Sequence, residues 1–181
     1  MELDYFEAKD FSEKLFEGCL NYINDDLWAY KKKRLNIDFS LEMGTNDINA
    51  EAKVNTHGMY QIKLEMAAVN WIYQFYNRTM VNEGFYRLVS ANKEYTRKDA
   101  ALYVDKMAEM TIKNILYHEC GHIFNGHVDF IKLKNDEYNK VNKLNMIEDE
   151  FFTLYEISAK ARPYLKPKEW QALEWNADDF A

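Results

Sequence analysis

A chain of 181 residues is long enough to bury a hydrophobic core without disulfide bonds, and this length fits one domain. Apolar residues make up 48% of the chain and there are only six glycines and two prolines, which excludes a disordered or fibrous protein and favours a helix-rich fold. The net charge is −7 and the basic residues are scattered, apart from residues 31–34, so a broad cationic surface for nucleic acid is excluded.

The ends and the cysteines of the chain indicate where the protein works. Its first residues are acidic and lack the basic-then-apolar order of a signal peptide, and no apolar run approaches the ~18 to 20 residues that span a bilayer. Only Cys19 and Cys120 are present, which fits a reducing compartment. We therefore expect a cytoplasmic protein with neither a membrane nor a nucleic acid as partner.

The first third of the chain predicts a helix and then a small sheet. Apolar residues recur at helical spacing over residues 11–23, which predicts an amphipathic helix. Strict alternation over residues 35–43 predicts a half-buried strand. A second alternating stretch follows the turn-like sequence of residues 55–58, so residues 50–64 are predicted to form a hairpin. The expected result is an antiparallel sheet of two or three strands.

Helical patterns return after the sheet. Residues 67–80 predict a mostly apolar helix, and residues 82–95 a connection. Thr96, with Asp99 three residues later, resembles a capping box, and the apolar residues beyond it repeat at helical spacing up to His118. One long helix is therefore predicted to lead into the region of His118.

The last fifty residues predict two further helices. A polar interval at residues 132–145 is predicted to separate the long helix from another helix over residues 146–161, which stops before Pro163. The final helix is predicted to begin near Pro167, a residue suited to the first helical turn. We expect residues 1–181 to form a single α+β domain, mainly helical, with a small antiparallel sheet packed beside the long helix.

The sequence His118-Glu119-Cys120-Gly121-His122 carries the candidate chemistry. Two histidines four residues apart project from one face of a helix, so both imidazoles can reach one metal ion. Glu119 is placed to take a proton from water held by that metal, and Gly121 leaves space beside it. The pattern predicts a catalytic zinc ion with Glu119 as general base. Cys120 points away from the histidines, and we interpret it as a small buried packing residue.

A catalytic zinc ion usually takes three protein ligands, so one more ligand is expected at a distance. Glu174 in the final helix is the preferred candidate, because Asp178 lies one turn later and can accept the free N–H of a ligating histidine. Four other acidic residues also follow the motif and stay open as alternatives: Glu148, Asp149, Glu150 and Glu156. Asp179 is expected to be exposed.

These motifs resemble a known family. The segment 118–122, followed by Glu174-Trp175-Asn176-Ala177-Asp178, is similar to the gluzincin pattern of zinc metallopeptidases, and residues 123–127 with the C-terminal end most resemble the Lit-like phage-exclusion peptidases. The resemblance covers roughly residues 100–131 and 167–181. It implies a zincin-like fold, a Zn²⁺-dependent endopeptidase with Glu174 as third ligand and Asp178 behind a histidine, a host translation factor as substrate and a role in phage defence.

One departure from the gluzincin pattern leaves alternatives open. These enzymes commonly supply a His or Tyr after the Glu helix to stabilise the oxyanion, but this sequence ends at Ala181. Either that group comes from upstream, from His127 or a tyrosine, or the chain is a fragment that lacks a C-terminal part. The rival hypotheses are a catalytically silent zinc-binding regulatory or interaction module and a structural protein without metal.

Overall fold

The computed structural model describes residues 4–27, 36–43, 48–55, 57–81, 97–142, 151–153, 167–179 and 181. The fold is α+β and mainly helical. In chain order its elements are α1 (Tyr5–Tyr22), the π-helical turn η1 (Ile23–Leu27), β1 (Ile37–Glu42), β2 (Ala50–Asn55), β3 (Tyr60–Glu65), α2 (Met66–Val81), α4 (Arg97–Phe124), α5 (His127–Asn142), β4 (Phe151–Thr153) and α7 (Pro167–Asp178).

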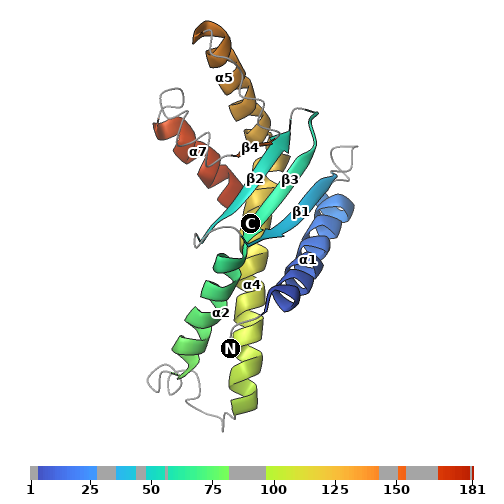
Figure 1. The fold of residues 1–181 in the computed structure, drawn as a ribbon, viewed down its shortest axis with the longest axis vertical. Helices are drawn as coiled ribbons and strands as arrows, with labels where there is room; N and C mark the ends of the chain where they lie inside the picture. The colour runs from blue at the N-terminus through green and yellow to red at the C-terminus, as the bar shows by residue number, and fades with distance from the viewer. Residues whose placement is uncertain are drawn as a thin grey trace.

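Helix α4 is the central element of the fold (Figure 1). It contacts α1, α2, α5 and α7, and on its sheet side it contacts β2 and β3. Its fully buried side chains Ala108, Ile112, Leu116 and Cys120 recur every four residues, so one stripe of the helix faces the common core. The predicted long helix that leads into the motif is therefore confirmed.

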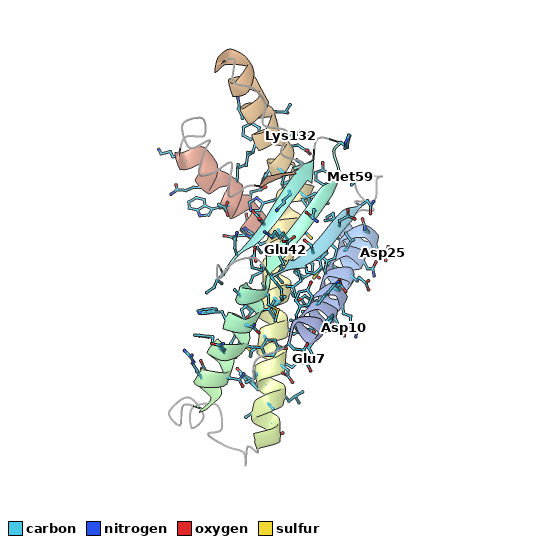
Figure 2. The ribbon with its side chains drawn as sticks, in the orientation of Figure 1. Glu7, Asp10, Asp25, Glu42, Met59 and Lys132 are labelled. Atoms are coloured by element: carbon cyan, nitrogen blue, oxygen red, sulfur yellow. The ribbon has the colours of Figure 1, made fainter. Side chains whose placement is uncertain are left out.

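Helix α1 begins earlier than the apolar pattern predicts. Asp4 accepts a hydrogen bond from the Glu7 backbone N–H at 2.9 Å, and the Glu7 side chain accepts from the Asp4 backbone N–H at 3.2 Å. This capping box starts the helix at Tyr5 and satisfies two backbone donors at its first turn. Figure 2 shows Glu7, Asp10 and Asp25 on the outer side of this segment, while its apolar face packs on α4 and β1.

The sheet has four strands in the order β1-β3-β2-β4, and it is mixed instead of purely antiparallel. The predicted hairpin is confirmed, since β2 and β3 pair antiparallel with Ala52 opposite Ile62. The predicted first strand is also confirmed, but β1 pairs parallel with β3, with Ile37 opposite Tyr60. The reason is that the hairpin inserts β3 between the two earlier strands, which run in opposite directions.

Two predictions for the region after α4 are wrong. Residues 132–142 belong to α5 instead of a polar interval; the helix is anchored by the buried Val128 and Ile131, and lysine and glutamate sustain it despite the missing apolar periodicity. Within the predicted helix 146–161, residues 151–153 form β4, because the edge of β2 at Lys53–Asn55 offers a strand partner to Phe-Phe-Thr, which favours strands.

The remaining predicted elements either match the structure or fall on residues that the structure does not describe. Helix α2 confirms the prediction for residues 67–80, and α7 begins at Pro167 as predicted. The predictions for residues 82–95, Thr96 and the remainder of 146–161 lie outside the described residues. None of the helices in the described ranges combines the length and the apolar character that a bilayer crossing requires.

Candidate metal centre

Three side chains from α4 and α7 converge on one point. The Nε2 atoms of His118 and His122 lie 3.0 Å apart. Oε2 of Glu174 lies 3.4 Å from Nε2 of His118 and 3.7 Å from Nε2 of His122. The two histidines meet because residues four apart share one face of α4, and Glu174 reaches them because α7 packs against α4. Among the described residues these three form a group that could hold a metal ion.

The donor set and its spacing fit zinc. Zinc takes histidine nitrogen and carboxylate oxygen at about 2.0–2.2 Å, which places the ligand atoms of a tetrahedral site about 3.3 Å from one another. The three separations of 3.0, 3.4 and 3.7 Å bracket that value. Two histidines and one glutamate also match the open type of zinc site, in which a fourth position is left for water or substrate.

The protonation of His118 and the protonation of Glu174 are strongly coupled. Hydrogen bonding to Glu174, with help from Glu119 and Asp178, raises the pKa of His118 to about 9. The interaction with His118, and after it the contact with His122, lowers the pKa of Glu174 to about 2. Without metal, a proton on His118 therefore takes part of the place of the cation, and the two shifts describe one ion pair.

Asp178 lies where the sequence predicts it. Its Oδ1 is 2.8 Å from Nδ1 of His118, so the carboxylate accepts the ring N–H and leaves Nε2 directed toward Glu174. The Asp178 side chain is 67% exposed and that of His118 is 22% exposed, so water screens part of this interaction.

Glu119 is buried beside the three converging side chains. Only 7% of the residue is exposed, and burial raises the pKa of its carboxyl group above the ordinary value, although His122 and His118 oppose the shift. The backbone N–H of Ala52 in β2 donates to this carboxylate. Glu119 is thus fixed between the sheet and the two histidines, with a pKa moved in the direction that suits a general base.

The structure brings a third histidine, His127, into contact with this cluster. This residue starts α5, is 5% exposed, and its Nδ1 lies 3.1 Å from Nδ1 of His122. Its Nε2 lies 3.1 Å from Oδ1 of Asn176. Burial and the neighbouring His122 lower the pKa of His127, which favours a neutral ring. Both ring nitrogens of His127 are engaged and His127 does not line the cleft described below, so the structure gives no support to it as the upstream oxyanion group. The sequence offers one local sign of the turn, a glycine followed by a histidine directly after the end of α4.

A cleft of about 470 Å³ opens beside His118 and Glu119. Its wall is mostly apolar, with neutral polar groups and Asp178 at the rim. The lining residues are Ile48, Asn49, Ala50, Leu64, Ala68, Thr111, Asn114, Ile115, His118, Glu119, Asp178 and Ala181. No tyrosine is among these lining residues, so a tyrosine as oxyanion group finds no support in the described part of the chain.

The structure describes some of the remaining candidate residues and not others. Cys120 is fully buried and burial raises the pKa of its thiol, so its interpretation as a packing residue is confirmed. Asp179 is exposed, as expected. The alternative ligands Glu148, Asp149, Glu150 and Glu156 lie outside the described residues.

Comparisons of the chain with models of known protein families, with curated proteins and with solved structures gave no match.

Proposed function

We propose that this protein is a zinc-dependent peptidase, with His118, His122 and Glu174 as metal ligands and Glu119 as general base. The observation that carries the proposal is the convergence of these three ligand atoms, with separations of 3.0 to 3.7 Å, beside a buried glutamate and an open cleft. The gluzincin-like order of the same residues along the chain supports it.

Zinc held at this site would polarise the scissile carbonyl and make water acidic enough to attack at neutral pH. Glu119 accepts the proton of the attacking water, because its buried carboxylate lies next to the histidines and has a raised pKa. It then donates a proton to the leaving amine. The Ala52 N–H keeps the Glu119 carboxylate in place during both transfers.

The edge of β2 offers a place for the substrate backbone. The Asn49 carbonyl accepts from the Glu65 N–H, so Asn49 faces β3, and the alternation of an antiparallel ladder turns the backbone of Ala50 toward the cleft. Strand β4 covers β2 only at Lys53–Asn55, and no other described strand lies beside residues 50–52. An extended peptide could therefore add to this edge as a further strand.

The cleft favours a neutral substrate side chain next to the scissile bond. Ile48, Leu64 and Ile115 form apolar walls, and among the described lining residues the acidic side chains are Glu119 and the exposed Asp178. A carboxylate in the cleft would be repelled by both and would lose its hydration. Because the motifs resemble those of the Lit-like peptidases, a host translation factor is the protein substrate to test first.

The proposal is tested by metal content and cleavage together. Purified wild type should hold about one zinc per chain. Glu174→Ala should lose the zinc, whereas Asp179→Ala, an exposed acid on the same helix, should keep it. A peptide library analysed by mass spectrometry should show cleavage by wild type and not by Glu119→Gln, with apolar residues enriched and acidic residues depleted beside the cut.

The outcomes separate the rival hypotheses. Zinc without any cleavage that depends on Glu119 would support a zinc-binding regulatory module instead of a peptidase. Wild type that binds no zinc would leave only a structural role for the histidine and glutamate cluster.

A further inference from the structure

His127 connects the metal centre to a residue that no ligand argument explains. One of its ring nitrogens contacts His122 and the other contacts the side chain of Asn176, each across 3.1 Å. The rings of His122 and His127 stand nearly perpendicular, at 70°, with their centres 5.3 Å apart. The side chain of Asn176 and the rings of His127 and His122 thus form a continuous chain of hydrogen bonds from α7 through the start of α5 to α4.

Asn176, at the outer end, decides which atoms donate and which accept along this chain of hydrogen bonds. The atom that Asn176 presents is its carbonyl oxygen Oδ1, which can only accept, so Nε2 of His127 must donate. A neutral imidazole that donates from one nitrogen accepts at the other, so Nδ1 of His127 accepts from Nδ1 of His122. The proton of neutral His122 then lies on Nδ1, and the lone pair of Nε2 faces His118 and Glu174.

We propose that Asn176 and His127 are positioning residues that fix His122 in the tautomer able to bind metal. This inference rests on the zinc site of the proposed function, but it does not require that the site cleave peptides. Without a fixed acceptor at Nδ1, the proton of His122 is free to occupy Nε2, where it must be displaced before a metal can bind.

The backbone around His127 is built to hold this contact. Gly126 has a φ of +74°, a left-handed conformation that turns the chain sharply between α4 and α5 and brings His127 back onto His122. The Gly126 N–H donates to the Ile123 carbonyl at 3.0 Å, which fixes the turn. The Asn125 side chain donates to the backbone carbonyl of Asn176 at 3.2 Å, so α7 is tied to the same turn.

Burial explains why the two histidine ligands are oriented by different means. His118 is oriented by Asp178, whose carboxylate is 67% exposed and remains hydrated. His122 and His127 are 2% and 5% exposed, so water has little access to their shared hydrogen bond. A carboxylate in the place of His127 would be desolvated next to Glu119, whereas a neutral histidine can be buried there at smaller cost, and the exposed Asn176 holds its outer nitrogen.

Two substitutions of Asn176 separate the proposed role from simple packing. Asn176→Gln keeps a neutral amide oxygen that can accept from His127, so it should preserve the direction of the chain. Asn176→Leu has similar size but offers no acceptor. Both variants keep the backbone carbonyl that Asn125 contacts, so the tie between α7 and the turn persists. Asn77→Leu on α2 is the matched control, because within the described residues the Asn77 side chain donates to the Tyr73 carbonyl of its own helix, away from the histidines.

The experiment uses the full chain labelled with ¹⁵N-histidine. In metal-free wild type, Asn176→Gln and Asn77→Leu, the nitrogen spectrum of His122 should show a protonated Nδ1 and an unprotonated Nε2. In Asn176→Leu the proton should move wholly or partly to Nε2. Zinc affinity, measured by competition with a chelator, should fall about 10- to 100-fold in Asn176→Leu and stay close to wild type in the other two.

The possible failures are distinguishable. Wild type that binds no zinc overturns the proposed function, yet the tautomer of metal-free His122 still decides the present inference. An unchanged His122 tautomer and unchanged zinc affinity in Asn176→Leu would overturn the positioning role. Equal losses in Asn176→Gln and Asn176→Leu would do the same, because they would trace the effect to packing instead of to an acceptor.

Discussion

Nδ1 of His118 lies 2.8 Å from Oδ1 of Asp178, although the two residues are sixty positions apart in the chain. The contact joins α4 to the end of α7, one turn after Glu174 on the same helix. A single short helix thus supplies both a candidate metal ligand and the acceptor that orients another ligand. Removing the acceptor should therefore affect metal binding without removing any ligand.

Asp178→Ala is expected to weaken zinc binding by about 10-fold, the lower end of the effect of such orienting groups, because water can replace an acceptor that is 67% exposed. Chelator competition measures the change. Asp179→Ala, one residue later and exposed, serves as the control and should bind zinc like wild type. Equal affinities for all three proteins would show that Asp178 does not orient His118.

Glu119→Gln is expected to lower the rate of peptide cleavage about 10²- to 10⁴-fold while zinc remains bound, because the amide cannot take a proton from water. The glutamine is nearly isosteric and its carbonyl oxygen can still accept from Ala52. Steady-state kinetics on any cleaved library peptide, with zinc content measured in parallel, makes the test. Retained activity would exclude Glu119 as the general base.

The metal-free protein is expected to be most stable between about pH 4.5 and 6.5. The pKa of His118 is raised to about 9 in the folded state from 6.5, so its contribution is complete below pH 6.5 and is lost as pH rises through 9. The pKa of Glu174 is lowered to about 2 from 4.5, so its contribution is complete above pH 4.5 and is lost as pH falls through 2.

Thermal unfolding of chelator-treated protein across this pH range measures that dependence. Glu174→Gln should flatten both limbs of the profile, since it removes the carboxylate that both shifts share. A profile that is the same in wild type and Glu174→Gln would mean that the ion pair does not contribute to stability.

Two glycine substitutions should have opposite effects on stability. Gly126→Ala places a side chain at φ +74°, which costs about 1–2 kcal/mol even though nothing lies within 4 Å of the added carbon. Gly18→Ala lies within α1, also with nothing within 4 Å, and should stabilise the fold by about 0.5–1 kcal/mol. Urea unfolding of both variants shows whether each substitution lowers or raises the free energy of unfolding. A stabilising Gly126→Ala would argue against the left-handed turn that places His127.

Elements with a strong internal period could be predicted from the sequence. The alternation in β1 and the hairpin, and the helical spacing in α2 and α4, reflect burial of one face. The order of apolar and polar residues along the chain reveals such a face. The parallel pairing of β1 with β3 could not be predicted, because alternation identifies a strand but not its neighbour. Strand β4 was missed because it is only three residues long and depends on the edge of β2.

The candidate site, like the fold, could be predicted from the sequence only in part. Local spacing predicts that His118 and His122 share a face, and the structure places Glu174 and Asp178 beside them. The contact of His127 with His122 depends on the reversal of the chain at Gly126, and its contact with Asn176 depends on the docking of α7. Both are properties of tertiary structure that no spacing in the sequence expresses.

Helix α7 is held to the body by few apolar contacts. Among its described side chains only Ala177 is fully buried, with Leu173 partly buried, while Trp175 is 70% exposed. Its other attachments in the described residues include the polar contacts of Glu174, Asn176 and Asp178 with the histidines and the hydrogen bond from Asn125 to the Asn176 carbonyl. An ion held at the proposed site would add a further link between α4 and α7, so metal binding and the docking of this helix would strengthen each other.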